Sequence, residues 1–158
     1  MRLVWITGLL ALAIFAGLAW QLAPLEPGVV ALQLAFTPRG FGEIVHRWSA
    51  DDLLRYRRHL PLDCVLLVLY GSFGYLLARR SRLFARAAPP LARFATWALP
   101  AAAVCDAVAN AFHGWFTAAP RFGMPQLYAL SAGCSLLKWV LLMGFAVAVA
   151  LALWRAES

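Results

Sequence analysis

The sequence predicts an all-α membrane protein: a single domain, residues 1–158, in which four transmembrane helices form a bundle. Of its 158 residues, 63% are hydrophobic and only 13% are charged, which is too little charge to cover a soluble domain of this size. The apolar residues also gather in four continuous runs, each long enough to cross about 30 Å of hydrocarbon. Because these runs do not alternate with polar residues, transmembrane β-strands are not expected.

The four predicted spans are bounded by proline, glycine or arginine. They cover residues 3–23, 61–78, 97–118 and 127–154. The first run is longer than the apolar part of a typical signal peptide, so we interpret it as a retained anchor that ends at Pro24. Pro120 follows the third span, and the fourth span is long enough to require tilt. Small residues, among them Gly17, Gly71 and Gly74, predict places where helices approach closely.

Arginines in the loops favour an orientation with both termini in the cytoplasm of a bacterial cell, across the inner membrane. One side holds seven basic residues: Arg2, Arg79, Arg80, Arg82, Arg86, Arg93 and Arg155. The other side holds six: Arg39, Arg47, Arg55, Arg57, Arg58 and Arg121. The numbers of basic residues on the two sides are close. The cluster between residues 79 and 93, which contains no acid, decides the predicted orientation. Helical spans and the absence of organelle signals favour a bacterial inner membrane.

The net charge of +7 is best explained by membrane lipids. The arginines lie in short loops beside apolar runs, where anionic headgroups are the nearest partners. Nucleic acid is therefore not an expected partner. A small apolar ligand, a second copy of the chain or another membrane protein remain open as partners.

The loop of residues 24–60, which connects the first two spans, predicts two short amphipathic helices that lie in the membrane–water interface, outside the hydrocarbon. Thr37 and Pro38 form a helix start, and apolar residues then recur on one helical face up to Trp48. Ser49 and Asp52 resemble a capping box that starts a second helix. Two interpretations stay open: the helices pack on the membrane surface, or they form a lid over a cavity between the spans.

Polar and ionisable side chains within the spans predict an internal cluster. The second span contains Asp63 and Tyr70; the third Asp106, Asn110 and His113; and the fourth Ser131, Ser135 and Lys138. A charge in the hydrocarbon costs about 2.5–3.5 kcal/mol on insertion scales. Within each span the spacing is helical, so a bundle can turn all three faces inward. Helical rise brings Asp106 and Lys138 to similar depths, which predicts an ion pair, with Asp63 near the outer end of its span as a second partner of Lys138.

No cofactor or metal is predicted. Haem in a bundle usually needs two axial histidines, and only His113 lies in a predicted span. Zinc-ligand spacing and a Cys-x-x-Cys pair are both missing from the sequence. Cys64, Cys105 and Cys134 each lie in a different span and are interpreted as packing residues.

Several short motifs resemble those of a known family. They are Ala35-Phe36-Thr37-Pro38, Trp48, Asp63 with Tyr70, and Asp106-Ala107-Val108-Ala109-Asn110. The pattern is similar to that of an uncharacterised family of small bacterial four-span integral membrane proteins and covers about half of the chain. That family often has glutamate before the asparagine, where this chain has Ala109. The resemblance implies the four-span architecture and a role for Asp63, Asp106 and Asn110, but it implies no reaction.

The sequence leaves three functions open. The first is binding of a lipid or small apolar molecule at the polar cluster, with a carboxylate as general acid or base if the protein is an enzyme. The second is a structural or assembly subunit of a larger membrane complex, in which the ion pair only fixes the helix register. The third is a transporter or proton pathway, for which four spans would require oligomerisation.

Overall fold

All regular secondary structure in the described residues is helical. The computed structural model describes residues 1–85, 87–119 and 121–157; Arg86 of the basic loop and Pro120 after the third span lie outside the described residues. The helices are α1 (Arg2–Leu22), α2 (Val29–Gln33), α3 (Pro38–Arg47), α4 (Ala50–Arg80), α5 (Pro89–Ala118) and α6 (Pro125–Glu157). Four of them, α1, α4, α5 and α6, are long and apolar enough to span a membrane. The predicted fold class is therefore confirmed.

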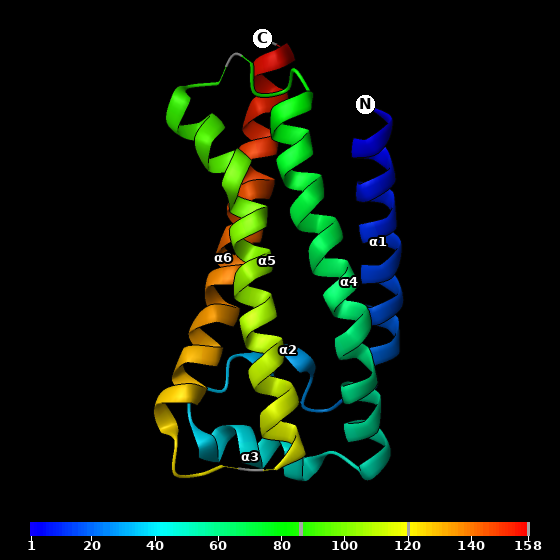
Figure 1. Cartoon of the computed structure of the whole chain (residues 1–158), viewed down its shortest axis with the longest axis vertical. Coiled ribbons are helices and arrows are strands. Elements are labelled where there is room, and N and C mark those ends of the chain that lie inside the picture. The colour runs from blue at the N-terminus through cyan, green and yellow to red at the C-terminus, as the bar shows by residue number, and fades with distance from the viewer. Residues whose placement is uncertain (86, 120, 158) are drawn as a thin grey trace.

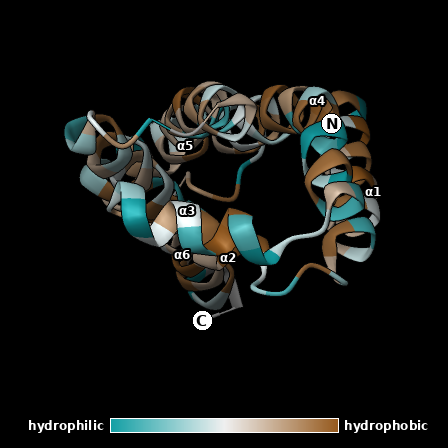
Figure 2. Ribbon diagram, turned by 90° about the horizontal axis from the view of Figure 1, so that it is seen from below, coloured by the Kyte–Doolittle hydropathy of each residue, from teal (hydrophilic) through white to brown (hydrophobic). Residues whose placement is uncertain are grey.

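The long helices pack side by side in the order α1, α4, α5, α6 (Figure 1). In the described residues α1 packs along α4 and has no comparable interface with α6. The two ends of this row therefore leave one side of the bundle open, as the view along the helices indicates (Figure 2). Both termini lie at one end of the bundle, the termini end, whereas α2 and α3 lie at the opposite end, the loop end (Figure 1).

The two middle helices begin earlier than predicted. Helix α5 begins at Pro89 rather than near residue 97. Pro89 and Pro90 occupy the first turn, where a missing backbone N–H removes no helical hydrogen bond, and Pro100 lies inside the helix. Helix α4 begins at Ala50 rather than near residue 61 and continues through Pro61.

The second short helix predicted from the sequence is therefore the beginning of α4. Its capping box forms as expected: Ser49 Oγ accepts a hydrogen bond from the Asp52 backbone N–H, and the Asp52 carboxylate accepts one from the Ser49 backbone N–H. The first turns of α4 are also held by tertiary contacts, since Tyr56 is fully buried and Arg57 donates to the carbonyl of Thr117 at the end of α5. These contacts offset the one backbone hydrogen bond that Pro61 cannot make.

Helix α3 forms as its sequence predicts and closes the loop end. The Thr37 hydroxyl accepts a hydrogen bond from the Gly40 N–H at 3.1 Å. The apolar face of α3 is turned inward, with Phe41 buried against Phe116 of α5 and Tyr128 of α6. After α3, the Trp48 indole N–H donates to the Pro27 carbonyl at 2.9 Å and ties the two ends of the loop together.

Small residues set the approach of α4 to α5, whereas Gly17 of α1 is not at a close contact. A Cβ added at Gly71 would lie 3.1 Å from Ala103 Cβ, and one added at Gly74 would lie 2.5 Å from Leu99 Cβ. The α4–α5 contact therefore depends on both glycines. The prediction of a close contact at Gly17 is wrong, because nothing lies within 4 Å of a Cβ added there.

Candidate functional site

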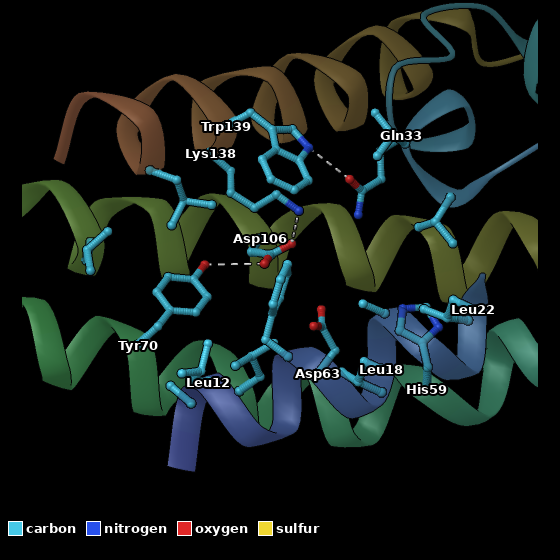
Figure 3. A pocket seen from close by; sticks show the side chains of 18 of the residues that line it. Leu12, Leu18, Leu22, Gln33, His59, Asp63, Tyr70, Asp106, Lys138 and Trp139 are labelled. Atoms are coloured by element: carbon cyan, nitrogen blue, oxygen red, sulfur yellow. Dashed lines mark hydrogen bonds and ion pairs between the residues drawn. The ribbon is translucent and has the colours of Figure 1, made fainter. Parts of the chain in front are cut away.

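A cavity of about 660 Å³ lies on the open side of the bundle, between α1 and α6. Helices α4 and α5 form its back wall, and α2 lines it at the loop end (Figure 3). Its apolar walls include Leu12 and Phe15 of α1, Leu66 of α4 and Phe145 of α6. Its polar groups are few and converge from different helices: Gln33, His59, Asp63, Tyr70, Asp106, Lys138 and Trp139. This size and composition are typical of small-molecule sites.

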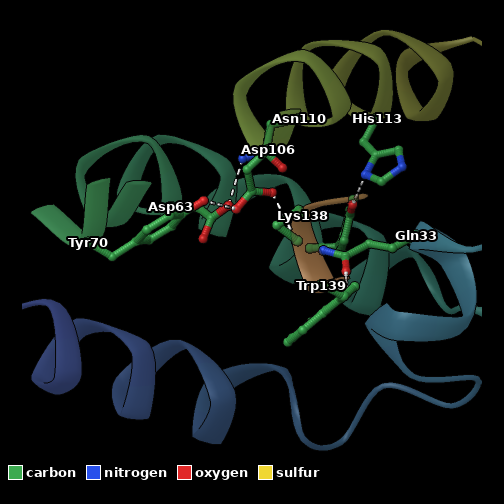
Figure 4. A network of polar contacts seen from close by, with 9 residues as sticks. Gln33, Asp63, Tyr70, Asp106, Asn110, His113, Lys138 and Trp139 are labelled. Carbon is green, nitrogen blue, oxygen red and sulfur yellow. Dashed lines mark hydrogen bonds and ion pairs between the residues drawn. The ribbon is translucent and has the colours of Figure 1, made fainter. Parts of the chain in front are cut away.

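The predicted ion pair is present at this cavity. Lys138 Nζ of α6 lies 2.9 Å from Asp106 Oδ1 of α5, and each residue is only 4% exposed. The Tyr70 hydroxyl of α4 donates to the other carboxylate oxygen, Oδ2, at 3.2 Å. Three helices are thus joined through one carboxylate whose two oxygens both have partners (Figure 4). The Lys138 ammonium also lies 5.0 Å from the centre of the Trp139 ring.

The second carboxylate, Asp63, has a different environment. Its Oδ2 accepts a hydrogen bond from Asn110 Nδ2 at 2.6 Å. The predicted ion pair with Lys138 is not formed, and no cation of the described residues pairs with Asp63. The carboxylate is partly exposed and points into the cavity (Figure 3). Asp63 therefore presents an unpaired carboxylate to the cavity.

The predicted depth of Asp63 is also wrong, because α4 is longer than the predicted span. Asp63 lies 13 residues after Ala50, or about 20 Å along the helix. Asp106 lies 12 residues before Ala118, or about 18 Å from the corresponding end of α5. Both carboxylates therefore lie near the middle of the bundle, at similar levels.

The structure separates His113 and Ser135 from the two carboxylates. The His113 ring is buried, and its Nδ1 is hydrogen-bonded to the Tyr56 hydroxyl at 2.9 Å. Ser135 is fully buried, and its hydroxyl has no hydrogen-bond partner in the described part of the chain. Neither residue lines the cavity, and neither does Asn110. Of the seven predicted site residues, four line it: Asp63, Tyr70, Asp106 and Lys138.

Three polar residues of the cavity were not predicted: Gln33, His59 and Trp139. His59 precedes Asp63 by one helical turn, and its Nδ1 contacts the Tyr56 carbonyl. The helical spacing would have revealed His59, had α4 been extended back through Pro61. The Trp139 indole N–H donates to Gln33 Oε1 at 3.1 Å and joins α6 to α2. No sequence pattern indicates this contact, because the two residues lie far apart in the chain.

The Tyr56–His113 hydrogen bond gives a first testable prediction. Replacing Tyr56 with phenylalanine keeps the buried ring but leaves His113 Nδ1 without a partner, which should lower the free energy of unfolding by about 1–2 kcal/mol. Unfolding followed by circular dichroism in mixed micelles measures the change. Tyr75→Phe is the matched control, since Tyr75 is exposed and, within the described part of the chain, makes only a ring contact with Trp97. Equal stability of both variants would contradict the prediction.

The arrangement can hold the polar end of an amphipathic molecule while its chain lies along apolar walls. Asp106 and Lys138 neutralise each other, and Asp63 supplies a free acceptor.

Compared with known proteins, the chain matches no family model, no curated protein and no solved structure. The family resemblance of its short motifs therefore stays a prediction.

Proposed function

We propose that the protein binds one amphipathic molecule, a lipid or a small apolar compound, in the cavity between α1 and α6. The observation that carries this proposal is the unpaired Asp63 carboxylate, which faces an apolar cavity in the middle of the bundle. An ionisable side chain at such a depth is costly and is usually retained for a function.

A role in fixing the helix register does not explain why position 63 carries a charged side chain. The pair of Asp106 and Lys138 already joins α5 to α6, and Tyr70 adds α4. Asn110 could donate the same hydrogen bond to an asparagine side chain at position 63, which would carry no charge. A ligand group that pairs with the Asp63 carboxylate supplies the missing reason for the charge.

The shape of the bundle supports access from the membrane. The cavity lies between α1 and α6, which have no extensive interface in the described residues. Leu12, Phe15 and Ala19 of α1 line the cavity and are also exposed. At the loop end α2 contributes Val29, Val30 and Gln33 to the lining. A molecule in the bilayer would therefore enter sideways, with α2 closing the cavity at that end.

A matched pair of α1 variants tests this function. Ala19 lines the cavity, whereas Ala16 is exposed and lies outside its lining. We expect native mass spectrometry of gently extracted wild-type protein to show a bound small molecule. Ala19→Trp should lose most of it, because the indole would fill the space between α1 and α6. Ala16→Trp places the same side chain on the same helix and should retain the ligand.

Two results would contradict the proposal. One is a ligand-free spectrum of the wild-type protein extracted under conditions that preserve lipid contacts. The other is equal retention of the ligand in Ala19→Trp and Ala16→Trp. A partner membrane protein that co-purifies with wild type and is lost only in Ala19→Trp would instead favour the assembly-subunit function.

We further propose a bacterial inner membrane with the termini end in the cytoplasm. Arg2, Arg79 and Arg80 lie at this end, as do Arg82, Arg93 and Arg155. The tendency of lysine and arginine to stay in the cytoplasm supports this orientation. Labelling of single cysteines introduced at Ser81 and Arg39, in a variant lacking Cys64, Cys105 and Cys134, would test it.

A further inference from the structure

We infer that the polar end of the ligand is a protonated amine that pairs with Asp63. This inference rests on the proposed function and specifies the chemical class of the ligand. Three features of the cavity support it: its charges, the hydrogen bond that already holds its lysine, and the free oxygen of Asp63.

The charges of the cavity favour a cation. Its lining contains two carboxylates, Asp63 and Asp106, one ammonium, Lys138, and one imidazole, that of His59, which is buried and is counted as neutral. Because Lys138 and Asp106 form a buried pair, the remaining negative charge is that of Asp63. One ammonium group from the ligand makes the four charges sum to zero. In a medium of low polarity this neutralisation is strongly favoured over an uncompensated carboxylate.

An anionic head group does not fit the same lining. No arginine of the described residues lines the cavity. The ammonium of Lys138 is already hydrogen-bonded to Asp106, so a phosphate or carboxylate would compete with that bond. It would also lie beside the negative charge of Asp63. Fatty acids and anionic phospholipids are therefore disfavoured as ligands.

The hydrogen bonds at Asp63 also favour a donor. Asn110 donates to Oδ2, whereas Oδ1 accepts no hydrogen bond from the described residues. An alcohol could donate to Oδ1 but would leave the charge uncompensated. An ammonium group supplies both the hydrogen bond and the charge. The apolar walls that extend along α1 and α6 accommodate the hydrocarbon chain of such an amine.

Three probes of equal chain length test the inference: dodecylamine, dodecanol and dodecanoic acid. An equimolar mixture is added to purified, delipidated wild-type protein, and the bound species are counted by native mass spectrometry. We expect dodecylamine to bind at least about tenfold more tightly than the other two, because a charge-assisted hydrogen bond is stronger than one between neutral groups. Asp63→Asn should remove this preference and leave dodecanol binding nearly unchanged.

Asp51→Asn is the matched control. It removes one negative charge from the exposed first turn of α4, so it reports any general attraction of dodecylamine to acidic residues. The preference for the amine should persist in Asp51→Asn. Equal binding of amine and alcohol by wild type, or an amine preference that survives Asp63→Asn, would overturn the inference while the proposed cavity binding stands. Binding of none of the three probes would overturn both.

Discussion

Replacing Lys138 with methionine is expected to lower the free energy of unfolding by about 3–5 kcal/mol. The substitution removes the ammonium that lies 2.9 Å from Asp106 Oδ1, in a place where both residues are 4% exposed. Methionine keeps most of the volume of the lysine stem, so packing changes little. The Asp106 carboxylate would keep only the hydrogen bond from Tyr70, which cannot compensate a buried charge.

The double variant Asp106→Asn/Lys138→Met should recover most of the lost stability. Asparagine is close in shape to aspartate and still accepts the hydrogen bond from Tyr70 Oη, while neither position of the former pair carries a charge. Replacing a complete buried pair is often nearly neutral, whereas removing one partner is not. A double-mutant cycle, measured by unfolding in mixed micelles of dodecyl maltoside and dodecyl sulfate, gives the coupling energy of the pair.

The exposed pair of Arg39 and Glu43 on α3 provides the comparison. Its atoms lie 2.8 Å apart, but the two side chains are 90% and 57% exposed. Arg39→Met should therefore change the stability by less than about 1 kcal/mol. If Lys138→Met were no more harmful than Arg39→Met, or if the double variant were as unstable as Lys138→Met alone, the pair would not hold the bundle together.

The sequence predicts the fold class because each apolar run alone is long enough to define a helix. It also predicts α3 and the capping box at Ser49, since both depend on contacts between residues three or four positions apart. The bounds of α4 were wrong because Pro61 is a local signal for a break. The burial of Tyr56 and the bond from Arg57 to α5 override that signal, and neither follows from local sequence.

The site is only partly predictable, because the contacts between helices that form it do not follow from local sequence. Asp106 and Lys138 are the most costly residues of their helices, and their pairing follows from depth and charge. Periodicity shows which face of a helix is polar, but it does not show which helices are neighbours. The separation of α1 from α6, which creates the cavity, therefore could not be predicted. The hydrogen bond of Asp63 with Asn110, in place of an ion pair with Lys138, could not be predicted either.

The close approach of α4 to α5 gives the second large expected effect. Gly74→Val should lower the free energy of unfolding by about 2–3 kcal/mol, the typical cost of overpacking a tight contact. A Cβ at this position would lie 2.5 Å from Leu99 Cβ and 2.7 Å from its Cγ. Because Leu99 Cβ is fixed to the α5 backbone, the two helices would have to move apart, and rotation of the Leu99 side chain could not relieve the contact.

Gly17→Val separates this steric effect from the general cost of valine in a helix. Nothing lies within 4 Å of a Cβ at Gly17. In the same mixed-micelle titration, the free energy of unfolding of Gly17→Val should therefore stay within about 0.5 kcal/mol of wild type. Since Leu99 of α5 and Phe73 of α4 both line the cavity, separating the two helices should also weaken ligand retention in Gly74→Val. Equal stability of the two glycine variants would mean that α4 and α5 adjust to a side chain at position 74, and that the glycine does not determine their spacing.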